Sequence, residues 1–336
     1  MIPHTELHWQ TQTWQAQLKR AYRHPADLLA ALDVDVKQLK VPVCTKSPFP
    51  MLVPESFMAR MERGNPDDPL LMQVLPVEAE HRGADGFVHD PLAEAASNPI
   101  PGLVHKYHNR VLLIATGGCA INCRYCFRRH FDYSANKPSH SEWQIALDYI
   151  ARRTEIDEVI LSGGDPLLLN DRNLAELIRK ISEIPHIKRL RIHSRIPVVL
   201  PARCTETLLT TLSNSRLDTV LVIHANHPNE INDEVAKALC KFRLAGITAL
   251  NQSVLLNGIN NAVAQLIQLS EALFEAGVLP YYLHLPDRVA GTAHFFVDET
   301  EARALYQKLQ TATSGYLVPK LVKETPGWPA KQRLGL

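Results

Sequence analysis

From about residue 110 onward, short apolar runs alternate with segments in which apolar residues recur at helical spacing. RVLLIAT at 110–116, for example, is a compact apolar run of strand length. The segment NLAELIRKISEI at 173–184 is typical of the helical patterns between them. Six strand–helix units of this kind predict parallel strands joined by right-handed crossovers. The six runs lie at residues 110–116, 158–164, 189–194, 218–225, 247–256 and 279–287.

Six units are fewer than the eight that close a full (β/α)8 barrel. The pattern therefore predicts an α/β protein with an open, partial (βα)6 TIM-like barrel, or alternatively a doubly wound sheet. No G-x-G-x-x-G stretch opens the first unit, which weighs against a dinucleotide-binding fold. A last short strand is predicted within GYLVPKLVKE at 315–324.

The first 105 residues have a different pattern. HPADLLAALDV at 24–34 and PESFMARMERG at 54–64 have helical spacing, and prolines break the chain between such segments. We therefore expect a mostly helical N-terminal region at 1–105, a barrel at 106–314 and a C-terminal segment at 315–336.

Composition narrows the class of protein. Of 336 residues, 46% are hydrophobic, and 36 basic against 35 acidic residues give a formal charge of +1. That balance does not indicate a nucleic-acid or membrane-surface partner. No apolar run is long enough for a transmembrane helix and no secretory signal is visible, so a cytoplasmic location is expected.

Unusual polar residues follow the predicted strands. GGDPL follows the second strand, HSR ends the third, HANHPNE the fourth, and NQS lies in the fifth. In parallel sheets and barrels, ligands bind at the carboxyl ends of the strands. Their shared location therefore predicts a functional site at that end of the barrel.

A cysteine cluster follows the first strand of the barrel. Cys119, Cys123 and Cys126 are spaced C-x3-C-x2-C. In a reducing compartment, such clustering indicates metal or redox chemistry. Three thiolates could hold zinc with His130 as the fourth ligand, or a [4Fe–4S] cluster that keeps one iron open.

The cluster resembles the signature of radical S-adenosylmethionine (SAM) enzymes, in which SAM chelates the open iron and is cleaved to a 5′-deoxyadenosyl radical by an electron donor. An aromatic residue usually precedes the third cysteine, as Tyr125 does here. SGGDPL resembles the family's glycine-rich SAM-binding stretch, which would assign Gly163, Gly164 and Asp165 to cofactor binding. Gln252 of NQS is also assigned to cofactor binding.

The resemblance extends to the lysine 2,3-aminomutase family over roughly residues 100–331. CRYCFRRH, SGGDPL, HSRIPVVLPAR, HANHPNE, NQSVLLNGINN, PYYLHLPD and SGYLVPKLVKETPGWPAK occur in the family's order. It implies pyridoxal 5′-phosphate (PLP) held covalently by Lys331 in PGWPAK, with Lys331 as the catalytic residue. Gln332 and Arg333 follow this lysine, where the family often has threonine and proline.

Further roles follow from the same resemblance. Tyr107 and Arg110, with Lys106, would bind the PLP phosphate. Arg128, two places after the third cysteine, would bind the substrate carboxylate, a task that suits a guanidinium fork.

The distal ammonium of lysine would be held by Glu324 and by the position of Asn261, where lysine-specific members have aspartate. An amide supplies a weaker grip than a second carboxylate. This pattern, with a short segment after Lys331, resembles the subgroup that converts (S)-α-lysine to (R)-β-lysine for translation elongation factor P and its ligase. The alternatives are an aminomutase for another amino acid, such as glutamate, and a zinc-binding non-catalytic adaptor.

Overall fold

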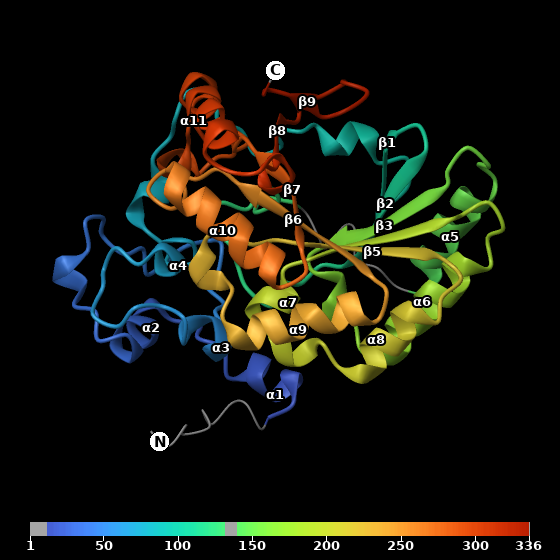
Figure 1. Cartoon of the computed structure of the whole chain (residues 1–336), viewed down its shortest axis with the longest axis horizontal. Coiled ribbons are helices and arrows are strands. Elements are labelled where there is room, and N and C mark those ends of the chain that lie inside the picture. Colours follow the sequence, from blue (N-terminus) through green and yellow to red (C-terminus); the bar gives the residue numbers. More distant parts are fainter. Residues whose placement is uncertain (1–11, 132–139, 336) are drawn as a thin grey trace.

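The computed structural model describes residues 12–131 and 140–335. The strands of this part of the chain form one nine-stranded sheet, in which the strand order follows the chain from β1 to β9 (Figure 1). Neighbours from β2 to β8 are parallel, and β1 and β9 pair antiparallel at the two edges. Strands added in one direction make a barrel wall, whereas a doubly wound sheet reverses its order at a switch point. The partial barrel is confirmed and the doubly wound alternative is wrong. The strands are β1 Leu103–Tyr107, β2 Arg110–Thr116, β3 Glu158–Gly163, β4 Arg189–Ser194, β5 Asp218–Ile223, β6 Thr248–Val254, β7 Leu279–His284, β8 Lys320–Lys323 and β9 Gln332–Arg333.

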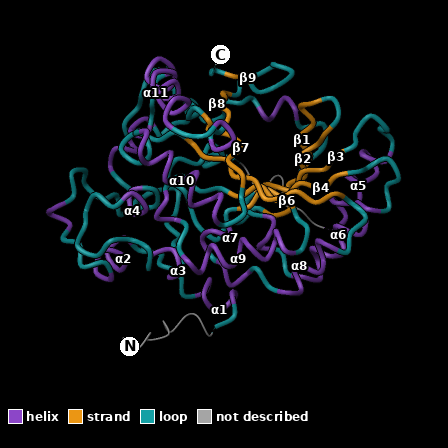
Figure 2. Tube along the Cα trace, in the orientation of Figure 1, coloured by secondary structure: helices purple, strands orange, loops and turns teal. Residues whose placement is uncertain are grey.

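Helices follow most strands and cover the outside of the sheet (Figure 2). Helix α6 shows why the pattern works: the Asn170 side chain caps it by accepting from Asn173 N at 2.9 Å, and its leucine and isoleucine face is buried. The helices are α1 Trp14–Lys19, α2 Pro25–Ala31, α3 Glu55–Met58, α4 Pro69–Met72, α5 His140–Ala151, α6 Asp171–Ser182, α7 Ile196–Val199, α8 Glu206–Ser213, α9 Asp233–Leu244, α10 Val263–Glu275 and α11 Glu299–Ala312.

The N-terminal region is less helical than predicted. Its described part holds four α-helices of four to seven residues, linked by 3-10 turns and irregular chain. Prolines restrict the backbone before them and cannot donate a helical hydrogen bond, so the apolar spacing there does not extend into long helices. Residues such as Leu28, Phe57 and Leu70 nevertheless belong to the same hydrophobic core as the barrel. The predicted boundary after residue 105 lies within β1.

The inside of the barrel is polar. On β4, Leu190, Ile192 and Ser194 are buried, and the alternating residues Arg191 and His193 are only partly buried. Because successive strand residues point to opposite faces, one face packs on the helices while the other lines the interior. This alternation makes room for a polar site within the sheet.

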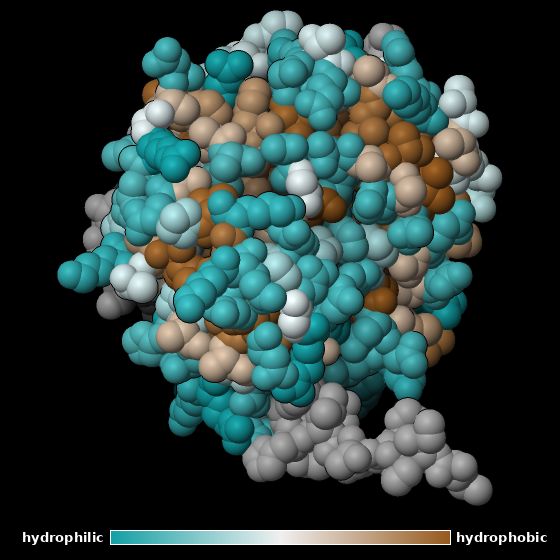
Figure 3. All heavy atoms as spheres, turned by 90° about the vertical axis from the view of Figure 1, so that its left-hand side faces the viewer, coloured by the Kyte–Doolittle hydropathy of each residue, from teal (hydrophilic) through white to brown (hydrophobic). Residues whose placement is uncertain are grey.

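On the side of the molecule that carries α2, α4 and α11, hydrophilic residues surround scattered hydrophobic ones (Figure 3). Among the helices within the described ranges, none is long and apolar enough to cross a membrane.

Candidate active site

The cysteine loop leaves β2 and is fixed by backbone contacts with the N-terminal region. Asn122 N donates to Leu52 O at 3.1 Å, and Arg124 N donates to Gln73 O at 2.9 Å. Burial raises the pKa of the Cys119 thiol, and Asp165, Cys126 and Cys123 add to the rise. The three sulfurs are partly buried and lie close enough for their charges to influence one another.

The donor set fits an iron–sulfur cluster better than a zinc ion. A tetrahedral zinc ion, at about 2.3 Å from each sulfur, would bring its ligands to about 3.8 Å from one another. The three sulfurs do not all approach within 4.8 Å; among the described residues, only Cys44, Glu78 and His81 do so as a group. His130 instead bonds Ala290 O at 2.9 Å and stacks on His89. A cluster with one cysteine on each of three irons suits more widely spaced thiolates.

Two arginines of the loop form a buried ion cluster with Glu80. Arg124 Nε lies 2.8 Å from Glu80 Oε1 and its Nη2 pairs with Oε2, while Arg129 Nη2 lies 2.5 Å from Oε2. Burial alone would raise the pKa of Glu80, but hydrogen bonds and charges from the two arginines hold it below its usual value. These two arginines therefore hold the N-terminal region against the loop.

The glycine pair after β3 lies against the backbone that leads into the cysteines. Gly163 has φ +116°, and a Cβ on Gly164 would lie 2.0 Å from Gly118 O. Gly164 N donates to Thr116 O at 2.7 Å, and Asp165 N donates to Gly118 O at 2.7 Å. The pair therefore locks two strand-end loops together. Any contact of this turn with a SAM amino group would use carbonyl oxygens, since an ammonium donates hydrogen bonds.

Asp165 connects this turn to the end of β4. Its carboxylate accepts from Ser194 Oγ at 2.7 Å, from Arg195 N at 2.7 Å and from Leu167 N at 3.1 Å. Burial raises the pKa of Asp165 to about 6, although these hydrogen bonds act to lower it. Both oxygens are thus bonded to protein groups, which makes Asp165 a structural tie beside the predicted cofactor turn.

Arg128 lies next to the glycine-rich turn and holds a carboxylate already. Its Nε and Nη2 atoms pair with the two oxygens of Glu94 at 2.8 and 2.7 Å, and its Nη1 lies 3.3 Å from Ser162 Oγ. The side chains of Arg128 and Glu94 are 7% and 12% exposed. The guanidinium is therefore oriented for two-point carboxylate binding.

Glu324 brings the two edges of the sheet together. It accepts from Lys106 Nζ on β1 at 2.6 Å and from Tyr107 OH at 3.1 Å, and it also pairs with Lys331 Nζ. Lys331 and Lys106 lower the pKa of Glu324 to about 2, although burial acts against them. Arg110 stacks on Tyr107, with its guanidinium carbon 4.0 Å from the ring centroid. Three of the four residues that the sequence assigned to PLP thus bond one carboxylate, and the fourth, Arg110, joins them only through the Tyr107 ring. A primary amine with cationic neighbours fits a phosphorylated aldehyde.

Two other predicted site residues, Asn261 and Gln252, form no hydrogen bond with this group of described residues. Asn261 accepts from Gly258 N at 2.9 Å and donates to Asn257 and Glu301, and so closes its own turn. Gln252 lies on the interior face of β6, in register with Tyr282 on β7.

Sequence reasoning missed two residues inside the barrel. Asp287 follows β7. Burial raises its pKa to about 7; the charge of Glu324 adds to this rise, and the charge of Lys331 opposes it. Burial lowers the pKa of His193, with Arg191, Lys331 and Arg128 adding to the shift. The strand-end motifs PYYLHLPD and HSR contained both residues, but no spacing rule marked them as interior.

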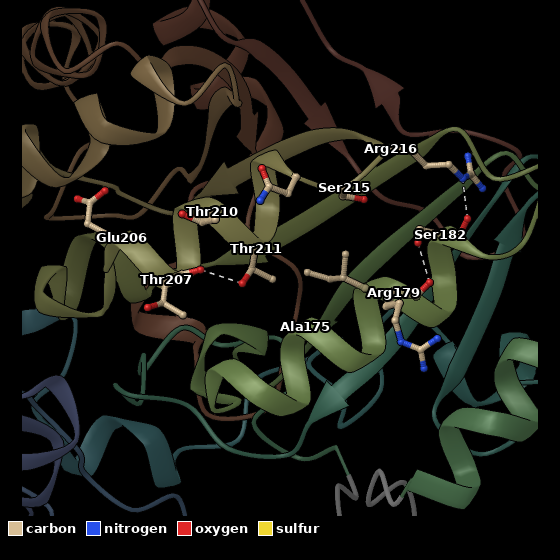
Figure 4. A pocket seen from close by; sticks show the side chains of 11 residues that line it. Ala175, Arg179, Ser182, Glu206, Thr207, Thr210, Thr211, Ser215 and Arg216 are labelled. Atoms are coloured by element: carbon tan, nitrogen blue, oxygen red, sulfur yellow. Dashed lines mark hydrogen bonds between the residues drawn. The ribbon is translucent and has the colours of Figure 1, made fainter.

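A surface groove between α6 and α8 lies away from the strand ends (Figure 4). Its polar groups bond within the groove: Thr211 Oγ1 donates to Thr207 O at 2.8 Å, and Arg216 Nε donates to Ser182 O at 2.6 Å. We assign it no chemistry.

Comparison with known proteins agrees with this geometry. Residues 113–269 match the radical SAM superfamily. A crystal structure of Streptococcus suis SuiB has a TM-score of 0.50 at 14% identity, over 66% of this chain and 50% of SuiB, which speaks for the fold alone. A partial barrel with three cysteines after its first parallel strand defines the class as a radical SAM enzyme.

Relatives define the family within that class. Proteins called L-lysine 2,3-aminomutase from Escherichia coli and Haemophilus influenzae are 51% and 48% identical to this chain. The matches cover 97% of this chain and 95% of the E. coli protein, and 98% of both chains for H. influenzae. A relative of the same name from Clostridium subterminale is 38% identical, over 86% of this chain and 69% of its own length. The chain belongs to the L-lysine 2,3-aminomutase family. It is an isomerase whose cofactors are a [4Fe–4S] cluster, SAM and PLP.

Proposed function

We propose that this protein converts (S)-α-lysine to (R)-β-lysine. The observation that carries the proposal is the meeting of Lys331, Lys106 and Tyr107 at Glu324, in a chain that matches lysine aminomutases over nearly its whole length. Residues 218 positions apart in sequence come together there.

Arg128 and Glu324 are proposed to hold the two ends of the substrate. Arg128 already binds a carboxylate through two donors of its guanidinium, the chemistry that an amino-acid carboxylate requires. Glu324 already binds the primary ammonium of Lys331, which is the same group that ends a lysine side chain. Asn261 does not contribute a second negative charge, so selectivity for the ammonium rests mainly on Glu324.

The cofactors are proposed to bind on either side of these residues. Cys119, Cys123 and Cys126 would hold the cluster, and Lys331 would hold PLP, with its phosphate near Lys106, Tyr107 and Arg110. When bound, SAM and the cluster supply the radical that removes hydrogen from the substrate, and PLP carries the migrating amino group. The surrounding residues orient the substrate and limit the access of water.

A functional link to translation elongation factor P follows from the resemblance of this chain to the subgroup described above. The β-lysine product would be consumed by a ligase that attaches it to a lysine of the factor. A cytoplasmic electron donor would reduce the cluster.

Substrate choice can be tested directly. The anaerobically reconstituted and reduced enzyme is incubated with SAM, PLP and separate amino acids, and the β-isomers are resolved on a chiral column. We expect (R)-β-lysine from lysine and no product from glutamate, because Glu324 would repel its side chain. A β-isomer of glutamate in place of β-lysine would contradict the proposal, and a colourless protein with one zinc ion would support the adaptor alternative.

The covalent role of Lys331 can be tested by Lys331→Ala. After borohydride reduction we expect the wild type to retain PLP and the variant to lose it, while both retain the same iron content. Lys320, the exposed first residue of β8, provides the matched control, and Lys320→Ala should retain both PLP and iron. Covalent PLP in Lys331→Ala would move the attachment to another lysine.

A further inference from the structure

A buried guanidinium lies against the cysteine loop and has no part in the roles assigned so far. Arg195, which follows β4, donates from Nη1 to Cys123 Sγ at 2.6 Å. Its guanidinium carbon lies 5.4 Å from the Phe57 ring and 5.6 Å from the Tyr125 ring. Arg195 is 7% exposed, so its charge acts in a medium of low polarity.

The opposite side of the guanidinium is held by two fully buried residues. Nη2 donates to Gln73 Oε1 at 2.8 Å and to Glu230 Oε2 at 2.9 Å. Glu230 is 0% exposed, and its second oxygen accepts from Asn226 N at 2.8 Å and from His227 N at 3.1 Å. The backbone N of Arg195 is fixed as well, through Asp165 Oδ2 at 2.7 Å.

These contacts come from separate parts of the chain. Gln73 belongs to the N-terminal region, Arg195 to the HSR motif at the end of β4, and Glu230 to the HANHPNE motif after β5. A carboxylate paired with one edge of a guanidinium leaves its other donors with a fixed direction. Here the remaining donor Nη1 points to the sulfur of Cys123. This arrangement explains why the two motifs each place a charged residue, Arg195 and Glu230, in the buried interior.

We propose that Arg195 is a positioning residue that raises the reduction potential of the [4Fe–4S] cluster through the Cys123 sulfur. This inference rests on the proposed cluster at the three cysteines. Reduction adds negative charge that spreads onto the ligand sulfurs. A donor with a fixed positive charge at one sulfur stabilises the reduced state more than the oxidised state. Glu230 and Gln73 keep the donor in place and leave it little freedom to reorient.

The test is a potentiometric titration of the reconstituted cluster, followed by electron paramagnetic resonance of the reduced form. We expect Arg195→Gln to keep the iron content of the wild type and to shift the midpoint to a more negative potential. Arg195→Lys keeps the charge but loses the fork, and its midpoint should lie between the two. Equal midpoints in all three proteins would overturn the proposal.

Arg216→Gln is the control. Arg216 is a cation that donates to Ser182 O at 2.6 Å and to Ile187 O at 2.8 Å, and to neither sulfur nor Glu230. Its midpoint should equal that of the wild type. Loss of iron from both Arg195 variants would make the residue a structural support and overturn the tuning role. Absence of a cluster in the wild type itself would instead contradict the proposed function.

Discussion

Arg128 and Glu324 each hold a protein group of the kind that they are proposed to hold on the substrate. The sequence could select both residues because each lies in a motif shared with a known family. It could not supply their partners, since Glu94 lies 34 positions before Arg128, and Lys106 lies 218 positions before Glu324. Pairing at such distances depends on how the strands are arranged, and no local spacing rule contains that information.

Arg128→Lys tests the carboxylate role. An ammonium is a point charge and cannot make the two parallel hydrogen bonds of a guanidinium. Loss of one charge-assisted bond corresponds to about 1.5–3 kcal/mol, so KM for lysine should rise at least about tenfold. PLP and iron contents should not change.

Arg152→Lys, on the surface after α5, is the control and should keep the wild-type KM. An unchanged KM in Arg128→Lys would place the substrate carboxylate elsewhere.

At the scale of the elements, the strands were predictable because short segments of strand length alternate with helical patterns and end at glycines or polar motifs. All six predicted barrel strands are present as β2 to β7. The resemblance assigns the glycine pair to SAM binding, and in the structure the group nearest to a Cβ on Gly164 is the backbone at Gly118. A sequence shows that a close approach is needed but not which group approaches.

Gly164→Ala tests this packing. The new Cβ would lie 2.0 Å from Gly118 O, so the β2 and β3 loops must separate. Overpacking of this kind costs about 1–3 kcal/mol or more, and the shift would displace Cys119. We expect a lower urea midpoint and reduced iron uptake.

Gly118→Ala is the control from the other side of the same contact. Its Cβ would meet only Leu168 Cδ1 at 3.5 Å, an ordinary contact, so stability and iron uptake should stay close to wild type. Equal losses in both variants would mean that the loop tolerates no side chain at all and that the clash is not specific.

At the scale of the molecule, an open sheet is joined by side chains at its edges. Lys106 and Tyr107 on β1 meet Glu324 after β8, and Glu80 holds the N-terminal region to the cysteine loop. The βα count predicted an open barrel but could not show how its edges meet, because those contacts involve charged groups without periodic spacing. For the same reason the sequence did not predict the interior of the barrel, where cationic residues act on histidine and carboxyl side chains.

The interior histidines make stability depend on pH. Burial lowers the pKa of His224 to about 3, with Arg195 adding to the shift and Glu230 opposing it. An unfolded histidine titrates near 6.5. Between these values the unfolded chain binds more protons, so stability is complete above pH 6.5 and falls as the pH drops toward 3. The slope is up to about 1.4 kcal/mol per pH unit for this one group.

Buried carboxyls act in the opposite direction. Burial raises the pKa of Asp165 to about 6 and that of Asp287 to about 7, so their contribution is complete below about pH 4 and is lost as the pH rises through those values. Between pH 7 and 5, the slope of the wild-type unfolding free energy against pH therefore contains contributions of both signs. A comparison between two proteins that differ at one group isolates the histidine.

His224→Gln provides that comparison, because glutamine can both donate and accept and so can keep the hydrogen bond between Tyr125 OH and position 224, which His224 Nε2 makes at 2.9 Å. Unfolding by urea is measured for both apoproteins at pH 7, 6 and 5. The wild type should lose more stability than the variant as the pH falls, by up to about 1.4 kcal/mol for each unit below 6.5. Parallel pH curves would mean that His224 takes up its proton in the folded protein, which would require the barrel interior to be far more hydrated than its packing indicates.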